Sequence, residues 1–528
     1  MADFAALARL GYAGFVLARA GAFSFFDIDA LPSGPRMVVR LAGFVEPHGL
    51  TSAERAARFR EALHRLGPSY IKLGQFLATR ADLVGSEAAE ALGKLRDELP
   101  PFPEAEARAT VEAALGRPVA SLFLSFSPAV AAASIAEVHK AEIVDEAGER
   151  RFVAVKILRP GVRQRFRTDL RTFFAGARFV ERFDPASRRL RPVTVVETLA
   201  RSVAIEMDLR LEAAALSEMA ELVAGDEGFR VPKVEWPLTA RDVLTLEWID
   251  GIKLSDTAAL AAAGFDLKLI ARRLMQAFLK QALRDGFFHA DLHQGNLFVD
   301  AAGNIVAIDF GIMGRLGPAE RRFLAEILYG FITRDYRRVA EVHFEAGYVP
   351  RVHAVDDFAQ AIRAIGEPIH GQAASSISMA RLLTLLFEVT EIFDMETRPE
   401  LILLQKTMVV VEGVARSLDP DFDMWATSEP VIRTWIERNL GPIGQLERAA
   451  AGLASLGRLA DELPRLAERA GRLSREFDSM GERGIKLDPD TVADIGRAEA
   501  REGRWGRVAL VVIAVVAVLL ALRLSIWR

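Results

Sequence analysis

The chain of 528 residues contains no cysteine. Disulfide bridges and thiolate metal sites are therefore excluded, and a protein that faces the cytosol is the natural expectation. An excess of charge of one sign is also missing, because 67 basic residues stand against 71 acidic ones and the net charge is -4. A general nucleic-acid binder would carry a strong basic excess, so no nucleic-acid partner is expected.

Unbroken apolar runs are scarce as well. The stretch from Phe4 to Phe26 is interrupted by Arg9 and Arg19, which argues against a secretory signal and favours a helix that packs on a core or lies at a membrane interface. The exception is Val508 to Leu522, fifteen apolar residues that span about 22 Å of a hydrocarbon core of about 30 Å. Extended to Trp527, this run predicts a single transmembrane tail anchor, rather than a buried core helix.

The stretch that says most about function is Phe288 to Asn296, which contains the motif H-x-D-x-x-x-x-N and is followed by Asp309-Phe310-Gly311. Protein-kinase-like folds use this pair of motifs to place a carboxylate beside the attacking group and metal ions on ATP. Asp309 would hold Mg²⁺ on the phosphates, Asn296 would hold a second Mg²⁺, and Asp291 would orient or deprotonate the acceptor. Strand-like runs on either side of Ala302 to Asn304 predict a hairpin that brings the two metal ligands together.

A lysine in a strand-like run supplies the next part of the pattern. Lys156 ends the run V-A-V-K, as the lysine that reaches the ATP phosphates does in kinases. A buried lysine needs a carboxylate partner. We expect Glu206 on a helix from Val195 to Leu216, with Glu212 as the alternative; the two lie about 240° apart around one helix, so one alone can face Lys156.

Other local signals place the remaining elements. Thr51 and Glu54 predict a capping box at the start of a helical region over residues 51–99, in which Lys72 and Gln75 share a face and Gly74 permits close packing. The backbone at Glu247 to Ile249 follows a strand and would bind adenine as an inter-lobe hinge. Further helices are expected at 104–115, at 267–284, from 312 to about 440, and over the leucine-rich residues 446–480.

Taken together, residues 30–440 resemble the UbiB group of atypical kinase-like proteins, also called the ADCK group. Lys72 to Gln75 match its K-x-G-Q element, and Glu206 to Asp208 match its E-x-D. Ala131, Ala132, Ala133 and Ser134 match the alanine-rich loop that replaces the glycine-rich loop of kinases. One departure is Glu137, where the group has Gln, and this leaves an amide-specific role at that position open.

The resemblance implies an α+β, bilobal kinase-like fold. We expect an N-terminal helical extension over 1–115, an N-lobe with a helical insert over 116–251 and a C-lobe over 252–440. A helical region over 441–503 and the anchor over 504–528 follow. The resemblance further implies that the K-x-G-Q helices cover the site where a kinase admits a peptide, so that Lys72 and Gln75 lie near the nucleotide and ordinary protein-kinase activity is disfavoured.

The function implied is that of a Mg²⁺-dependent ATPase or atypical kinase that supports ubiquinone biosynthesis. Its cofactors would be ATP and Mg²⁺, and its partners the membrane, polyprenylated ubiquinone precursors and the enzymes that process them. We expect the catalytic part in the cytoplasm and the anchor in the inner membrane. Phosphoryl transfer to a small molecule or protein and a nucleotide-sensing scaffold are the alternatives; a ring hydroxylase is weaker, since no flavin fingerprint or paired-histidine metal site is present.

Overall fold

The computed structural model describes residues 4–22, 45–47, 49, 51–78, 91–93, 95, 99–145, 147–183, 191–370, 389, 392–395 and 399–441. The chain divides into two compact units, Met1–Glu437 and Arg438–Arg528, and the features below belong to the first. The leucine-rich helix expected over 446–480 and the anchor expected over 504–528 lie outside the described residues. Within the described part, no helix has the length and apolarity needed to cross a membrane.

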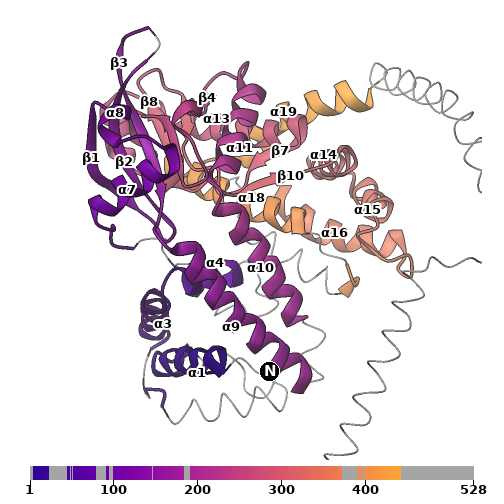
Figure 1. Ribbon diagram of the computed structural model, residues 1–528. Coiled ribbons are helices and arrows are strands. Elements are labelled where there is room, and N and C mark those ends of the chain that lie inside the picture. The colour runs from indigo at the N-terminus through magenta and orange to yellow at the C-terminus, as the bar shows by residue number, and fades with distance from the viewer. Residues whose placement is uncertain are drawn as a thin grey trace, which may run out of the picture. The chain divides into compact units, whose positions relative to one another are not determined.

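A group of helices formed mainly by the N-terminal part of the chain packs together below the first sheet (Figure 1). The capping box is confirmed, since the Thr51 hydroxyl accepts from Glu54 N at 3.3 Å and Thr51 N donates to the Glu54 carboxylate at 3.0 Å. The close packing at Gly74 is confirmed as well: a Cβ there would lie 3.0 Å from side-chain atoms of Leu63 and Leu95. The helices are α1 (Phe4–Arg19), α3 (Ser52–Leu66), α4 (Pro68–Ala78), α9 (Val162–Phe183) and α10 (Pro192–Glu206).

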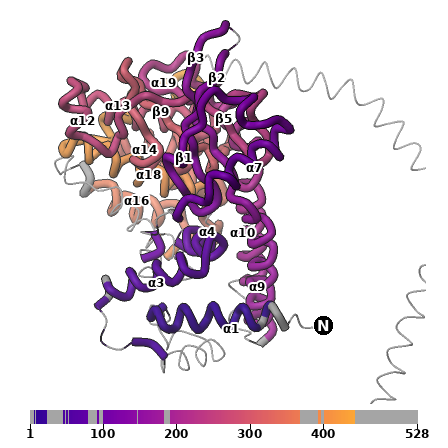
Figure 2. Tube along the Cα trace, turned by 60° about the vertical axis from the view of Figure 1, so that its left-hand side comes forward, coloured from indigo at the N-terminus to yellow at the C-terminus, as the bar shows by residue number. Residues whose placement is uncertain are grey.

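Helix α1 lies against the C-terminal half of α9 (Figure 2). The contact is close, because a Cβ on Gly176 would lie 3.4 Å from the Leu10 side chain, and Arg9 donates to the Thr172 hydroxyl at 3.1 Å. The buried residues of α1 include Ala6, Ala13 and Ala18. Tyr12 and Phe15 of the same helix are 61% and 51% exposed, so they point away from this packing.

The first sheet has four antiparallel strands in the order β1-β2-β3-β5. Alternate residues of β3, Val153, Val155 and Ile157, are buried in one cluster with Ala107 and Val111 of α7. The side chains of a strand alternate between faces, so Lys156 projects from the face opposite α7. The elements are α7 (Glu104–Leu115), α8 (Val119–Leu122), β1 (Ser125–Ala132), β2 (Ala136–Val144), β3 (Arg150–Leu158) and β5 (Val243–Glu247).

The single helix predicted from Val195 to Leu216 is wrong. The structure has two helices here, α10, which ends at Glu206, and α11 (Leu209–Val223), with Met207 and Asp208 between them. Asp208 has an extended backbone, and its side chain accepts from Arg210 N, which makes it the N-cap of α11. The break places Glu206 at the end of α10 and Glu212 in the first turn of α11, so the two carboxylates belong to different helices.

The second half of the unit carries the motif residues on two further sheets, of order β4-β9-β8-β6 and β10-β7. The predicted hairpin is confirmed as β8 (Leu297–Asp300) and β9 (Ile305–Ala307). Helix α13 (Leu267–Leu279) continues as a π-helix (Lys280–Asp285) into the motif strand β7. The other elements are β4 (Phe229–Arg230), β6 (Gly251–Lys253), α12 (Thr257–Ala262), β7 (Phe287–His289), β10 (Met313–Arg315), α14 (Pro318–Thr333), α15 (Tyr336–Glu345), α16 (Val355–His370), α18 (Pro399–Leu418) and α19 (Met424–Leu440), with 3₁₀ turns at Trp236–Leu238 and Gln294–Asn296.

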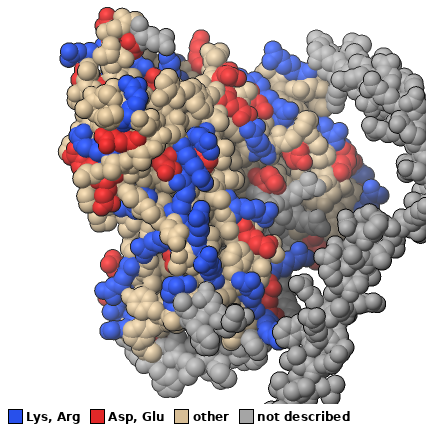
Figure 3. All heavy atoms as spheres, in the orientation of Figure 1, with Lys and Arg blue, Asp and Glu red and all other residues tan. Residues whose placement is uncertain are grey.

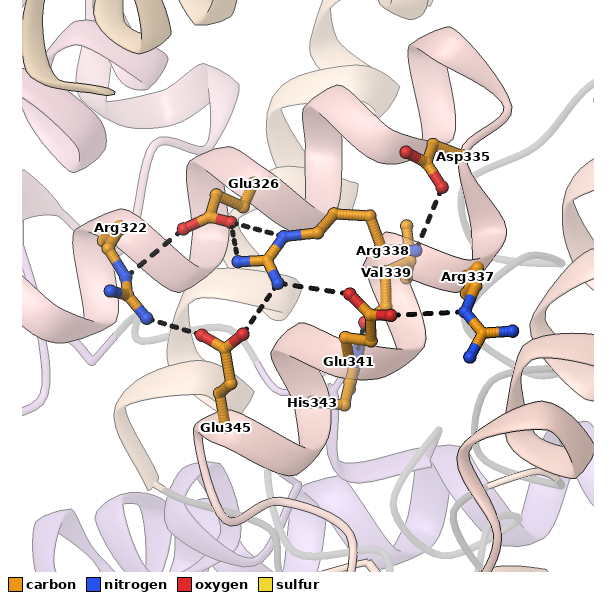
Figure 4. A network of polar contacts seen from close by, with 9 residues as sticks. All are labelled: Arg322, Glu326, Asp335, Arg337, Arg338, Val339, Glu341, His343 and Glu345. Atoms are coloured by element: carbon orange, nitrogen blue, oxygen red, sulfur yellow. Dashed lines mark hydrogen bonds and ion pairs between the residues drawn. The ribbon is translucent and has the colours of Figure 1, made fainter. Parts of the chain in front are cut away.

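A network of ion pairs joins α14 to α15 (Figure 4). Arg338 donates to Glu326 at 2.9 Å and to Glu345 at 2.7 Å, and Arg322 reaches Glu345 at 2.8 Å. Hydrogen bonds from Arg338 are the main cause of the lowered pKa of Glu345. The pairs hold the two helices together.

Candidate functional site

The catalytic-loop motif is anchored by a buried histidine. His289 is 0% exposed, its ring packs against that of Phe310 with centroids 4.8 Å apart, and its Nδ1 accepts from Asp291 N at 3.0 Å. Burial lowers the pKa of His289, which favours a neutral ring with its proton on Nε2. The histidine therefore orients the backbone at Asp291 while the Asp291 side chain stays about one-third exposed.

The hairpin brings the two predicted metal ligands together. Ile308 N donates to the carbonyl of Asn296 at 3.0 Å, so the residue before Asp309 is bonded directly to the end of the loop. The Asn296 amide nitrogen donates to the carbonyl of Asp291 at 3.3 Å, and the amide oxygen is the atom that a cation would bind. Asp309 Oδ1 accepts from Gly311 N at 3.0 Å, which fixes its orientation.

Lys156 lies between two carboxylates. Its Nζ is 2.7 and 2.9 Å from the two oxygens of Glu212 and 3.5 Å from Asp309 Oδ1. Burial acts against the charged lysine, but Asp309 and Glu212 outweigh it and raise the Lys156 pKa. Burial likewise opposes ionisation of Asp309, yet Lys156 and the Gly311 N–H hold the Asp309 pKa well below its ordinary range. At neutral pH both members of that pair are charged.

The predicted pairing of Lys156 with Glu206 is wrong, and Glu212, the alternative, occupies that place. The reason is the break at Met207 and Asp208, which starts a new helix that turns Glu212 inward, where it is 7% exposed. Glu212 also faces Phe310 N at 3.4 Å. Burial raises the pKa of the Glu212 carboxyl, and the charge of Lys156 opposes this shift.

Glu206 instead pairs with Lys72 of α4, at 2.9 Å, with both side chains about one-seventh exposed. The charge of Lys72 is among the causes of the lowered Asp309 pKa, so the N-terminal helices contribute a charge to the site. Gln75 lies on the same helix and is half-buried. The sequence could not reveal this ion pair, because the two residues are far apart along the chain.

The alanine-rich loop forms the end of β1 and the turn into β2. Arg159, just after β3, donates to the carbonyl of Ala133 at 3.1 Å and to that of Pro100 at 3.0 Å. The turn is thus tied to the linker that precedes α7. Ser134 is 0% exposed, and its hydroxyl has no hydrogen-bond partner among the described residues. Nucleotide binding by Ala131, Ala132, Ala133 and Ser134 stays a prediction.

Glu137 belongs to a buried pair that sequence reasoning missed. One carboxylate oxygen accepts from Phe102 N at 3.0 Å, and the other lies 2.9 Å from His139 Nε2. His139 Nδ1 lies 2.8 Å from the carbonyl of Ser127, so it must donate. The pair therefore needs a proton between Glu137 and His139. The spacing of two residues in a strand, which puts both on one face, was the available signal.

The hinge residues are partly engaged by the sheet. Glu247 N donates to the carbonyl of Lys233 at 2.8 Å, and Trp248 N donates to that of Phe152 at 3.2 Å. The Glu247 carboxylate pairs with Arg230 at 3.0 Å. Of the three hinge N–H groups, that of Ile249 alone lacks a hydrogen bond within the described residues. Adenine binding at Glu247, Trp248 and Ile249 stays a prediction.

Across the part of the chain that the structure describes, no three His, Cys, Asp or Glu side chains gather into a metal cluster. The predicted ligands are one aspartate and one asparagine, a set that relies on phosphate oxygens and water to complete the shell of a Mg²⁺ ion. The donor chemistry fits that ion, since both side chains present oxygen and lie at the joined ends of the hairpin.

Comparison with known proteins supports a kinase-like fold over most of the chain. A family model described as the ABC1 atypical kinase-like domain matches residues 94–343, and one described as the UbiB helical domain matches residues 362–423. These matches confirm the kinase-like α+β fold.

Curated relatives extend the similarity. A protein of Marinobacter nauticus named "Probable protein kinase UbiB" is 38% identical over 88% of this chain and 85% of its own. A protein of the same name from Xanthomonas axonopodis pv. citri is 39% identical over 84% of this chain and 82% of its own. A solved structure from Mycobacterium tuberculosis, titled as a complex of Rv3197 with erythromycin, is 26% identical, covers 72% of this chain and 96% of that one, and has a TM-score of 0.48.

Proposed function

The chain belongs to the UbiB family of atypical kinase-like proteins, and from that premise we propose that it is a Mg²⁺-dependent ATPase or atypical kinase of ubiquinone biosynthesis. It uses ATP to handle or present polyprenylated intermediates at the cytoplasmic membrane. The observation that carries the proposal is the assembled charge set, with Lys156 between Glu212 and Asp309 beside a loop that ends in Asn296.

Each side chain of the set has a definite task. Lys156 is kept charged by its two partners and donates to the α- and β-phosphates. Asp309, ionised through the neutral range, and Asn296 hold Mg²⁺, which supplies charge neutralisation at the phosphate oxygens when bound. Asp291 accepts a hydrogen bond from the attacking group, a water in hydrolysis or an acceptor hydroxyl in transfer, and takes its proton.

Helix α4 favours small or lipid acceptors over a protein substrate. The Lys72–Glu206 ion pair joins this helix to the end of α10, and Lys72 acts electrostatically on Asp309. A positive charge from outside the two lobes thus stands near the metal-binding aspartate, in the region the family resemblance assigns to the peptide-binding side of a kinase. This arrangement supports hydrolysis or transfer to a small acceptor.

The surface of the N-terminal helices supports a membrane partner. Helix α9 carries six arginines against one aspartate and one glutamate, and Figure 3 shows Lys and Arg side chains gathered over the region of α4 and α9. Tyr12 and Phe15 on α1 are more than half exposed. Basic and aromatic side chains together suit the headgroup region of anionic bilayers. With the tail anchor proposed over 504–528, this surface would keep the site close to its lipid substrates.

The test is ATP turnover by the full chain in detergent and in liposomes, with and without a phenol that resembles a ubiquinone precursor. Asp309→Asn should lower Mg²⁺-dependent turnover by about a hundredfold or more, whereas Asp421→Asn, on an exposed turn after α18, should leave it unchanged. Stimulation by lipid or phenol would support work on membrane-bound intermediates.

Other outcomes select the alternatives. A labelled phosphorylated product would indicate phosphoryl transfer rather than hydrolysis. Tight, metal-dependent nucleotide binding without turnover would favour the nucleotide-sensing scaffold. Absence of nucleotide binding by the wild-type chain would refute the assignment of Lys156 and Asp309.

A further inference from the structure

We infer that α18 positions the catalytic loop through two hydroxyl groups, those of Thr407 and Ser417. The inference rests on the proposed function, because it assigns these residues to the reaction at the same site. Neither hydroxyl touches the predicted nucleotide or metal ligands, so both are positioning residues that act through the loop backbone and Gln294.

The contact at Thr407 is buried and lies directly before the catalytic aspartate. Thr407 is 1% exposed, and its single hydroxyl proton is shared between two carbonyls, that of Ala290 at 3.0 Å and that of Leu403 in its own helix at 2.8 Å. Ala290 is the residue before Asp291, and its N–H donates to the carbonyl of Ile312 at 3.1 Å. The backbone of Ala290 is therefore held on its N–H side by Ile312, the residue before β10, and on its carbonyl side, next to Asp291, by α18.

The contact at Ser417 holds the middle of the loop. The Gln294 side-chain amide donates to the Ser417 hydroxyl at 2.7 Å, and this hydroxyl donates in turn to the carbonyl of Val414 at 2.6 Å. The Ser417 hydroxyl thus accepts one hydrogen bond and donates one. Gln294 lies between Asp291 and Asn296, so this bond restrains the segment that joins the catalytic aspartate to the metal-binding asparagine.

Apolar packing brings α18 to the loop but does not define its register. Buried side chains at helical spacing, including Leu404, Met408, Val411 and Ala415, lie in one core cluster with Ala290 and Leu292. Such packing tolerates small shifts of one surface along another, whereas hydrogen bonds have narrow distance limits. Two bonds ten residues apart, about 15 Å along the helix, fix both the position and the rotation of the loop.

The matched pair of variants for the buried contact is Thr407→Val and Thr172→Val. Each removes one buried threonine hydroxyl from a helix, and Thr172, also 0% exposed, lies on α9 away from the loop. We expect Thr407→Val to lower kcat about tenfold, with the affinity for Mg-ADP within about twofold of wild type. Thr407→Ser, which keeps the hydroxyl, should recover most of the loss, and Thr172→Val should not lower kcat.

The surface contact is tested by a double-mutant cycle. Ser417→Ala and Gln294→Ala should each lower kcat about two- to threefold, and the double variant should lose no more than either alone, because the two residues act through one bond. Additive losses would overturn the role of Ser417.

A readout that needs no activity separates this inference from the proposed function. In Thr407→Val and Ser417→Ala, amide hydrogen exchange should become faster across residues 290–296 and stay unchanged in β1 to β3. If the wild type binds but does not turn over ATP, the proposed function fails while the exchange result still decides the inference. Unchanged exchange in the loop, or equal kcat in Thr407→Val and wild type, would refute it.

Discussion

Replacing Glu212 and Glu206 one at a time gives the sharpest test of the corrected ion pairs. Glu212→Gln keeps the size of the side chain but removes the charge that lies 2.7 Å from Lys156 Nζ. A hydrogen bond to a charged group contributes about 1.5–3 kcal/mol, and loss of one member of a buried pair costs about 3–5 kcal/mol. Asp309 remains 3.5 Å from Lys156 and glutamine still accepts one bond, so we expect a loss of about 1–3 kcal/mol in unfolding free energy.

Stability alone does not distinguish the two variants, because Glu206→Gln also breaks a largely buried pair, with Lys72. Nucleotide binding does. Without Glu212, Lys156 is drawn toward Asp309, and the KM for ATP should rise at least about tenfold. In Glu206→Gln the Lys156–Glu212 pair is intact, so the KM should stay within about threefold.

The assays are urea unfolding and steady-state turnover on the full chain, with Glu197→Gln as a control at an exposed position of α10. A larger rise in KM for Glu206→Gln than for Glu212→Gln would refute the reasoning and restore Glu206 as the partner of Lys156. Equal effects of all three variants would show that the lysine is not held by a specific carboxylate.

Three further perturbations test other parts of the structure. Gly74→Val should lower the free energy of unfolding in urea by about 2–3 kcal/mol, because even a Cβ at this position would lie 3.0 Å from the side chains of Leu63 and Leu95. At Gly11 an added Cβ would meet no atom within 4 Å, so Gly11→Ala should stabilise α1 by about 0.5–1 kcal/mol. Burial opposes ionisation of Asp300, but Arg230 holds the pKa of this carboxyl below its ordinary value. The pair therefore adds stability above about pH 4, and this stability is lost as the pH falls toward the folded pKa. Arg230→Met should lower the free energy of unfolding at pH 7 by about 1 kcal/mol, and its difference from wild type should shrink in acid unfolding below about pH 4. Glu137→Gln should stay within about 1 kcal/mol of the wild-type stability in thermal unfolding, since an amide can accept from Phe102 N and donate to His139. Glu137→Leu can do neither and should lose about 2–4 kcal/mol. Equal losses in the two variants would mean that the site does not accept an amide.

The features that sequence predicted correctly are those with local causes. The capping box at Thr51 needs two side chains three residues apart, and the helix over 104–115 ends at a glycine with positive φ, Gly116. The hairpin that carries the predicted metal ligands has its turn residues between two short apolar strands. In each case the residues that decide the structure lie within about a dozen positions of one another.

The errors have a common physical origin in contacts between distant segments. Apolar periodicity continues through residues 195–216, so nothing in it marks the break, although Asp208 is a residue type that often begins a helix. The partner of Lys156 then depends on how α11 is turned against β3, which is a tertiary property. The same applies to Lys72 and Glu206, and to Thr407 with the loop, where neither side of the contact carries a local signal of the other.

The ion pair between Lys72 and Glu206 also has a consequence for how such a chain changes through descent. Loss of either residue leaves its partner charged and largely buried, which selection would act against. A lineage that replaces the lysine should therefore also replace the glutamate, so that the two positions, although distant in the gene, change together. Correlated substitutions at these two positions among natural sequences would then reflect the contact between the two side chains.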